Sequence, residues 1–482
     1  MSLQPILGVI GVVLTILGIA MLVPAAVEAG ARGPDGWVFA ASAGFTLFFG
    51  VLLALGGRSS GVVRLSVRQT FVLTNAVWLC VAVFAALPLH LSSLHLSVAD
   101  AAFEAMSGLT TTGSTVIVGL DQVPRGVLLW RGITQWLGGI GIIVMAMAVL
   151  PVLHVAGMSL FQSESSERSE KVLPHWAQIV RVTAQIYVAL TALCATAYWA
   201  LDMSGFDAVV HAMATLSTGG FGTSDSSFAI FQSPAIEWTG IVFMIAGGMP
   251  FVFYIQLVTH QREAALANSQ VRSFLALLVL VCLILSAWLA LTRGMAWHDA
   301  LGLVSFNVVS VVTTTGFVSA DYGQWGSFAV VAFFFLTFVG GCTGSTAGGI
   351  KIFHFQVLFA VARVQIRRLF HPHGVFVPRY GGKPIPDPVF VSVLSFLLLY
   401  VLSFAGFSLG LALFGLDLTT ALSGAATALA NVGPGLGDII GPAGNFASLP
   451  DGAKWLLSLA MLMGRLELFT VLVLLAPSFW RA

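Results

Sequence analysis

The sequence predicts an all-α polytopic membrane protein, in which an N-terminal helix pair precedes four pseudo-symmetric helix, pore-loop, helix repeats around a central axis. Three observations lead to this prediction. Of the 482 residues, 58% are hydrophobic and only 9% are charged, whereas a soluble domain carries about 25% charged residues. Ten apolar runs reach the length of about 20 residues that a helix needs to cross a membrane. Four short segments with a common polar stretch recur between the later runs.

The charge and cysteine content exclude other classes of protein. The formal net charge is +1, from 21 basic and 20 acidic residues, whereas a nucleic-acid-binding protein shows a basic excess on one face. The four cysteines, Cys80, Cys194, Cys282 and Cys342, lie in or beside apolar runs without metal-ligand spacing. We expect free thiols that pack in the core, and neither a disulfide framework nor a zinc site.

The ten expected spans, in chain order and with approximate ends, are 5–27, 37–57, 70–90, 127–153, 179–201, 236–259, 273–292, 327–362, 389–414 and 453–477. The first run has no basic residue ahead of it and is longer than the roughly 7 to 15 residues of a signal-peptide core. We therefore expect it to remain as the first helix. An even number of spans places both termini on the same side of the membrane.

The basic residues set the orientation. With the N-terminus in the cytoplasm, fifteen Lys and Arg residues fall inside and five fall outside, as expected from the excess of basic residues in cytoplasmic loops. Five acids fall inside and fourteen outside. An acidic outer face concentrates cations by its field and suits the outer mouth of a cation path. The alternative is that these acids only solvate the outer loops, because acids influence topology little.

Four short amphipathic segments, at 98–111, 205–218, 297–313 and 417–430, lie between pairs of long apolar runs. At about 1.5 Å per residue none of them can cross a bilayer, so each is predicted to be a re-entrant half-helix. Each begins at or near an acid that suits a helix N-cap. These acids are Asp100, Asp207, Asp299 and Asp417.

A polar, glycine-containing stretch follows each half-helix at intervals of roughly 100 residues, as in a fourfold repeat. Non-helical backbone at membrane depth is tolerated only where it is buried in protein or lines an aqueous cavity. Glycine can turn successive carbonyl oxygens toward one axis, and stacked carbonyls replace the hydration shell of a monovalent cation. The four stretches are 110–114, 217–221, 313–317 and 431–435, and they predict a central cation pore.

These residues resemble the Trk/Ktr/HKT superfamily of potassium transporters, most closely its bacterial Trk-type uptake proteins, over essentially the whole chain. The most specific stretches are Thr-Thr-Gly at 111–113, Thr-Gly-Gly-Phe-Gly at 218–222, Thr-Thr-Gly-Phe at 314–317 and Asn-Val-Gly-Pro-Gly-Leu-Gly at 431–437. No loop has the TVGYG of tetrameric potassium channels, so fewer ordered carbonyl layers are expected.

The resemblance implies that potassium, the transported ion, binds backbone carbonyls at one filter glycine per repeat and at the residues before it. The residues that carry this expectation are Thr111, Thr112, Gly113, Thr218, Gly219, Gly220, Thr314, Thr315, Gly316, Asn431, Val432 and Gly433. Both Gly433 and Gly435 could be the fourth filter glycine. We prefer Gly433, because Asn431 and Val432 precede it where Thr-Thr stands elsewhere. The expected division is 1–66 for the helix pair and 67–176, 177–268, 269–380 and 381–482 for the four repeats.

The run at 327–362 contains five glycines within ten residues. Each costs a helix about 1 kcal/mol relative to alanine, so we expect an unwound segment inside the membrane. The alternative is a small-residue face for helix packing. By resemblance this segment is an intramembrane gating loop beneath the filter. The residues expected to form it are Gly340, Gly341, Gly344, Ser345, Thr346, Gly348 and Gly349.

Arg465 falls near the middle of the last span, where a charge costs at least about 2.5 kcal/mol on insertion scales. We expect it to face the aqueous cavity and to act as a positive barrier to permeating cations. The alternative is an ion pair with Glu467, although residues two apart do not share a helix face. Glu467 is the only acid clearly inside a span, which favours downhill conduction over proton coupling.

The segment 363–388 is expected to be the longest basic cytoplasmic loop, and its His371 and His373 lack a third metal ligand. Resemblance implies a homodimer, a cytosolic nucleotide-binding regulator of the TrkA type that docks on this face, and a location among the lipids of the bacterial inner membrane. The main alternative function is sodium-coupled potassium transport of the Ktr type. A polytopic intramembrane enzyme is disfavoured, because we find no catalytic set.

Overall fold

The computed structural model describes residues 3–58, 65–148 and 176–481. Helices dominate these residues, and one two-stranded hairpin is the only sheet among them. This confirms the predicted all-α class. The end of the expected span 127–153 lies outside the described residues, as do six charged residues counted on the cytoplasmic side, namely Arg64, Glu164, Glu167, Arg168, Glu170 and Lys171.

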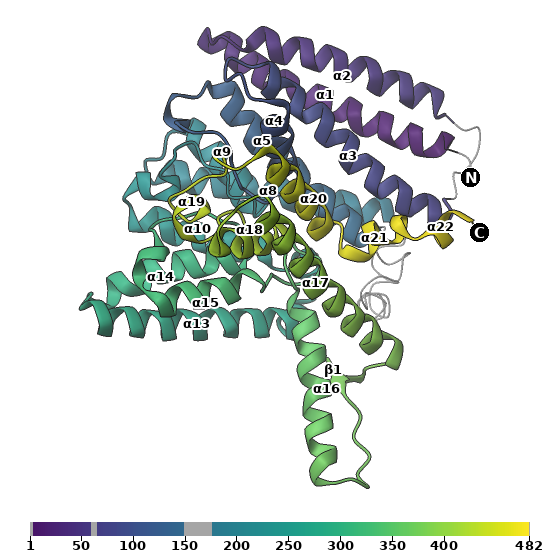
Figure 1. The fold of residues 1–482 in the computed structure, drawn as a ribbon, viewed down its shortest axis with the longest axis vertical. Coiled ribbons are helices and arrows are strands. Elements are labelled where there is room, and N and C mark those ends of the chain that lie inside the picture. The colour runs from purple at the N-terminus through teal and green to yellow at the C-terminus, as the bar shows by residue number, and fades with distance from the viewer. Residues whose placement is uncertain (1–2, 59–64, 149–175, 482) are drawn as a thin grey trace.

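The N-terminal pair consists of α1 (Gln4–Ala31) and α2 (Gly36–Gly56), which lie side by side along one edge of the molecule (Figure 1). Glycines allow their backbones to approach closely. A Cβ atom on Gly11 would overlap the backbone nitrogen of Ala54, and one on Gly50 would lie 2.7 Å from the backbone nitrogen of Thr15. Small residues at such contacts are typical of helices that pack within a membrane.

Four helix, half-helix, helix units follow this pair, as the sequence predicts. The first contains α3 (Val67–Leu91), α4 (Val98–Leu109), η1 (Leu120–Gln122) and α5 (Arg125–Ala148); the second contains α8 (Trp176–Ala200), α9 (Gly205–Leu216), η3 (Ser227–Phe231), α10 (Pro234–Gly248), α11 (Phe251–Val258) and α12 (Arg262–Leu266). The third contains α13 (Ser269–Arg293), α14 (Trp297–Val312), η4 (Tyr322–Trp325), α15 (Ser327–Thr337) and α16 (Ile352–Phe370). The fourth contains α17 (Asp387–Leu413), α18 (Leu418–Ala430), α19 (Gly437–Ile440), α20 (Asp451–Arg465), α21 (Leu468–Leu472), η5 (Val473–Leu475) and α22 (Pro477–Arg481).

Seven of the described helices are long and apolar enough to span a membrane, and two bent pairs bring this number to nine if each pair counts as one span. The run 236–259 bends by 93° between α10 and α11, where Pro250 cannot supply the backbone N–H that a continuous helix needs. The run 453–477 bends by 114° between α20 and α21. The run 327–362 is divided into α15 and α16 by the non-helical residues 338–351.

The four half-helices α4, α9, α14 and α18 begin and end within two residues of their predicted bounds. The predicted caps are wrong in three of them. Ser97 and Ser204 cap α4 and α9, and each accepts the backbone N–H of an aspartate three residues later. Ala296 stands at the start of α14 and offers no side-chain cap. Only Asp417 caps its helix, α18, as predicted.

The expected cytoplasmic loop 363–388 is largely ordered secondary structure. Helix α16 continues to Phe370, and β1 (Arg379–Tyr380) then pairs antiparallel with β2 (Lys383–Pro384). Gly381 and Gly382, both with positive φ, form the two-residue turn that such a hairpin requires. The end of α16 and this hairpin project away from the rest of the molecule (Figure 1).

The two ends of the described chain lie close together (Figure 1). Leu3, Phe479 and Trp480 line one cavity with the start of α3, and the rings of Phe71 and Phe479 lie 6.2 Å apart. The expectation that both termini lie on one side agrees with this contact.

Candidate ion-conduction site

The polar stretches after the four half-helices share one backbone conformation. One non-glycine residue in each lies in the left-handed region, with φ of 52° at Thr111, 52° at Thr218, 57° at Thr314 and 56° at Asn431. Two residues later a glycine again has positive φ, at 87° for Gly113, 78° for Gly220, 80° for Gly316 and 113° for Gly433. Gly435 is not among the glycines with positive φ, so Gly433 is the conformational counterpart of the other three.

The left-handed threonines indicate stored strain. A β-branched residue with positive φ is a genuine outlier, and such residues cost about 1–3 kcal/mol each. Three of the four equivalent positions nevertheless carry threonine, and all four side chains are fully buried. Strain that recurs at equivalent positions is typical of a functional site, where the surrounding structure holds the backbone in place.

The four glycines close a ring. A Cβ atom added to any one of them would meet a carbonyl oxygen of the next loop, namely that of the residue just before the next of the four glycines. A Cβ atom on Gly113 would meet the carbonyl oxygen of Gly219, and one on Gly220 would meet that of Thr315. A Cβ atom on Gly316 would meet the carbonyl oxygen of Val432, and one on Gly433 would meet that of Thr112. The first three contacts are overlaps, and the fourth is 2.8 Å. Each loop therefore faces the next in cyclic order, and the twelve residues predicted to bind the ion lie in one ring.

Hydrogen bonds between loops hold this ring closed on its outer side. The hydroxyl of Ser114 donates to the carbonyl of Gly433 at 2.8 Å, which joins the first loop to the fourth. The amide of Phe228 donates to the carbonyl of Val318 at 3.0 Å, which joins the second to the third. Between the first and second loops, the carboxylate of Asp225 accepts the backbone N–H of Gly119 at 2.8 Å.

A cavity of about 320 Å³ opens on the side of the ring that the sequence predicts to be the outer side, and the four positive-φ glycines of the ring line it. Its walls come from the four loops and from residues 440–446 after α19. Of the fourteen acids that the sequence places outside, Asp225 is the only one among the described lining residues of this cavity. Its carboxylate already accepts two backbone N–H groups. The acidic outer face is therefore not concentrated at the mouth itself.

Two residues counted as outer charges, Glu104 and Arg131, form a buried ion pair behind the first two loops, with 2.8 Å between Nε and the carboxylate. Arg131 also donates to the carbonyl of Gly222 at 2.9 Å, and its guanidinium lies 4.0 Å from the ring centroid of Phe221. The second carboxylate oxygen of Glu104 accepts the backbone N–H of Val116 at 2.9 Å. This pair therefore positions both loops rather than attracting ions.

Replacing Arg131 by Met should destabilise the protein by about 3–5 kcal/mol, because it leaves the Glu104 carboxylate buried without its cation. The measurement is thermal unfolding of the purified protein in detergent. The double variant Glu104→Gln, Arg131→Met should recover part of the lost stability, since no buried charge then remains. Equal unfolding temperatures for Arg131→Met and the unchanged protein would contradict this role.

Gln135 on α5 is a further support that the sequence analysis missed. Its side-chain NH₂ donates to the carbonyl of Gly219, and its side-chain oxygen accepts the backbone N–H of Phe221 at 3.1 Å. Asn431 acts similarly for the fourth loop, since its side chain donates to the hydroxyl of Thr112 at 3.0 Å and to the carbonyl of Met461 at 2.9 Å. A Gln inside an apolar run long enough to span the membrane is the sequence signal that could have identified the first of these.

The glycine-rich segment is unwound, as predicted, and the alternative of a helical packing face is wrong. Residues 340–348 are all buried and non-helical. Val339 and Ile350 form a parallel bridge that closes the segment into a loop. A Cβ atom on Gly340 would overlap the carbonyl oxygen of Gly348, so the two ends of the loop approach as closely as glycine permits. All seven predicted gating residues of this segment lie in this loop, which we call the glycine loop (residues 338–351).

The glycine loop packs into the break between α10 and α11. The carbonyl of Gly248 accepts the backbone N–H of Cys342 at 3.0 Å, and that of Gly247 accepts the backbone N–H of Thr346 at 3.2 Å. In return, the amide of Phe251 donates to the carbonyl of Gly344 at 2.9 Å. Both interruptions are therefore possible at membrane depth, because each supplies the hydrogen-bond partners that the other lacks.

The same loop contacts the third polar stretch and the ends of the half-helices α9 and α18. The backbone N–H of Gly348 donates to the hydroxyl of Thr314 at 2.7 Å, and a Cβ atom on Gly348 would overlap the carbonyl oxygen of Ala430. The hydroxyl of Thr346 donates to the carbonyl of Leu216 at 3.1 Å. These contacts place the glycine loop against three of the four repeats on the side of the ring opposite the outer cavity.

Arg465 is the last residue of α20 and is only 3% exposed. Its Nη1 donates to the carbonyl of Thr346 at 2.8 Å, whereas Nε and Nη2 have no hydrogen-bond partner among the residues that the structure describes. No ion pair within the described residues joins it to Glu467, which follows the helix break with φ of 58°. The alternative of an internal Arg–Glu pair is therefore wrong, and the arginine instead holds the glycine loop.

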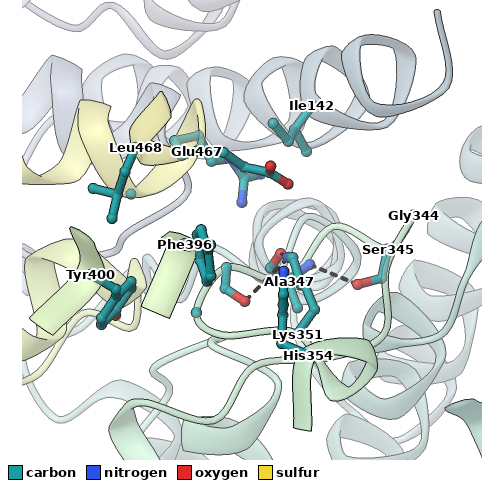
Figure 2. Close-up of a pocket in the computed structure, with 14 residues that line it drawn as sticks. Ile142, Gly344, Ser345, Ala347, Lys351, His354, Phe396, Tyr400, Glu467 and Leu468 are labelled. Atoms are coloured by element: carbon teal, nitrogen blue, oxygen red, sulfur yellow. Dashed lines mark hydrogen bonds between the residues drawn. The ribbon is translucent and has the colours of Figure 1, made fainter. Parts of the chain in front are cut away.

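A smaller cavity of about 40 Å³ lies beside the glycine loop and α20 (Figure 2). Its charged lining residues are Lys351, Arg465 and Glu467, and His354 and Tyr400 complete its polar wall. Within the described part of the chain, the ring nitrogens of His354, the hydroxyl of Tyr400 and one carboxylate oxygen of Glu467 have no hydrogen-bond partner. The cavity exceeds the roughly 10–15 Å³ that one water molecule needs, so the polar groups can be hydrated there.

Comparison with known proteins agrees with this architecture. The sequence profile of the family described as TrkH, cation transport protein, matches residues 37–481. The chain is 51% identical to the Trk system potassium uptake protein TrkI of Halomonas elongata, with 99% of this chain and 97% of that protein covered. It is 35% identical to the TrkH protein of Escherichia coli K12, with both chains fully covered.

The crystal structure of the potassium transporter TrkH from Vibrio parahaemolyticus superposes on the whole chain with a TM-score of 0.92, at 35% sequence identity and with full coverage of both chains. These relatives are transporters, which confirms the prediction that the chain is not an enzyme. Together with the match of the family profile over residues 37–481, they show that this chain belongs to the TrkH family of cation transport proteins.

Proposed function

We propose that this protein takes up potassium ions across the bacterial inner membrane through a filter made of the four polar stretches. The observation that carries the proposal is the cyclic contact of the four positive-φ glycines, each with the carbonyl oxygen before the next glycine. Carbonyl oxygens arranged around one axis replace the hydration shell of a monovalent cation. The names of the relatives, which are potassium uptake proteins, support potassium as the ion.

The filter consists of the twelve residues of the ring, and the gate consists of the glycine loop and Arg465. Contacts of this loop with Thr314, Ala430 and Leu216 support a position across the inner end of the pore. Arg465 adds a buried positive charge there, and a positive charge in the path opposes cations. In this proposal the loop must move before an ion can pass.

The larger organisation belongs to the same proposal. The chain divides at about residues 66, 176, 268 and 380 into the helix pair and four repeats. It crosses the membrane ten times when each bent or divided run is counted as one crossing. Both termini lie in the cytoplasm. Two copies form a homodimer within the lipid bilayer. A nucleotide-binding regulator of the TrkA type docks on the cytoplasmic face, where α16 and the β1–β2 hairpin project (Figure 1).

The test is rubidium uptake into liposomes that contain the purified protein, measured with and without sodium. Downhill conduction predicts initial rates that agree within about twofold, because an ion that moves down its own electrochemical gradient does not require sodium to move with it. A requirement for sodium would instead support the Ktr-type alternative, and uptake no faster than that of empty liposomes would refute the proposed function.

A further inference from the structure

Lys351 is a charged residue to which the proposed pathway assigns no role of its own. It is the last residue of the glycine loop and immediately precedes α16. Its ammonium group donates to the carbonyl oxygen of Ala347 and, at 3.2 Å, to that of Gly348. Two carbonyls of the loop therefore converge on one cation that the chain itself supplies.

The surroundings of Lys351 are unfavourable for a positive charge. The N-terminal end of a helix carries a partial positive charge, and Lys351 stands at that end of α16. Arg465 lines the same cavity, and the only carboxylate among its lining residues is that of Glu467. No ion pair within the described residues joins Lys351 to Glu467. Figure 2 shows the two side chains on opposite sides of the cavity.

The two carbonyls belong to the part of the glycine loop that adjoins the filter. The backbone N–H of Gly348 donates to the hydroxyl of Thr314 in the third filter loop. On the fourth repeat, a Cβ atom on the same glycine would overlap the carbonyl oxygen of Ala430. An ion that leaves the filter toward the cytoplasm therefore meets this part of the loop first.

We propose that the carbonyl oxygens of Ala347 and Gly348 form a monovalent-cation site at the inner end of the pore, and that the ammonium group of Lys351 occupies this site when the loop is closed. A lysine ammonium is a compact point charge with three N–H donors. It can therefore use the same carbonyl oxygens that would otherwise coordinate a permeating ion. The proposal rests on the proposed function, in which the glycine loop lies across the pore.

Replacing Lys351 by Ala should vacate the site. We expect rubidium uptake to rise about fivefold or more, and millimolar ethylammonium on the cytoplasmic side to return it to the rate of the unchanged protein, because the added ammonium takes the place of the missing one. The unchanged protein and Arg363→Ala, which removes an exposed cation from the same helix, should not respond to ethylammonium. If Lys351→Ala elutes as an aggregate in size-exclusion chromatography, Lys351→Gln replaces it in the same measurement.

Lys351→Arg separates this proposal from simple repulsion by a positive charge. If charge alone mattered, Lys351→Arg would conduct like the unchanged protein, and ethylammonium would not change rubidium uptake by Lys351→Ala. These two results together would overturn the proposal. We expect instead that Lys351→Arg conducts faster, because a planar guanidinium does not fit where a compact ammonium does.

A binding measurement tests the cation site at Ala347 and Gly348 separately from the proposed function of potassium uptake. Crystals of Lys351→Ala soaked in thallium should show an anomalous peak next to the carbonyls of Ala347 and Gly348, and crystals of the unchanged protein should show none there. A peak in neither crystal would refute the site even if potassium uptake is confirmed. A peak in the variant alone would support the site even if the transported ion proved to be different.

Discussion

Replacing Gly113 or Gly433 by Ser should reduce the selectivity for potassium over sodium by about tenfold or more, which corresponds to about 1.4 kcal/mol. Both glycines have positive φ, where a side chain adds strain. A Cβ atom on Gly113 would overlap the carbonyl oxygen of Gly219, and one on Gly433 would lie 2.8 Å from that of Thr112. Each substitution therefore displaces a carbonyl of the neighbouring loop as well as its own.

Rubidium uptake by the purified protein, in competition with sodium, measures this effect. Gly302→Ser is a matched control, because Gly302 lies in the half-helix α14 and the nearest heavy atom to an added Cβ is 4.0 Å away. The control should keep the selectivity of the unchanged protein. If both filter variants also kept it while remaining folded, the assignment of the filter would be wrong.

Replacing Arg465 by Ala should increase potassium flux about tenfold. A hydrogen bond from a charged donor contributes about 1.5–3 kcal/mol, and Arg465 donates one to the carbonyl of Thr346 in the glycine loop. The substitution removes this tether of the closed loop and the positive charge beside it, and both changes favour the passage of cations. Rubidium uptake into liposomes is again the measurement.

Arg465→Lys separates the two contributions. It keeps the charge, but a lysine does not reproduce the planar fork of the guanidinium, so we expect a flux between those of the unchanged protein and Arg465→Ala. An unchanged or lower flux in a folded Arg465→Ala protein would contradict the barrier. Folding is checked by the elution volume and the unfolding temperature in detergent.

Local features of the chain were predictable because they depend on neighbouring residues. The half-helices were placed to within two residues, since their length, amphipathic pattern and following glycine are all local. The glycine loop was predicted because five glycines in ten residues oppose a helix regardless of context. Three of the four caps were wrong because an aspartate at the third helical position and one at the cap give similar sequence patterns.

Other features depend on partners that are distant in the chain. Glu104 and Arg131 were counted with the outer charges, because only the approach of α4 and α5 shows that they form a buried pair behind the first two polar stretches. The break at Pro250 had a local signal in the proline itself. What contacts this break had no local signal, because the carbonyls freed there accept hydrogen bonds from the glycine loop of the next repeat.

The sequence by itself determined the class of protein, the number of repeats and the positions of the polar stretches. Apolar length and glycine content act through local physical effects, namely the cost of polar backbone in lipid and the conformational freedom of glycine. The tertiary structure alone decided which glycine completes the ring, what Arg465 holds and where Lys351 places its charge. The first two depend on a contact across repeats or on a backbone angle. Lys351 reaches carbonyls only three and four residues away, but the fold of the glycine loop that brings these groups together depends on contacts with other repeats. None of these contacts is encoded in the local pattern of residues.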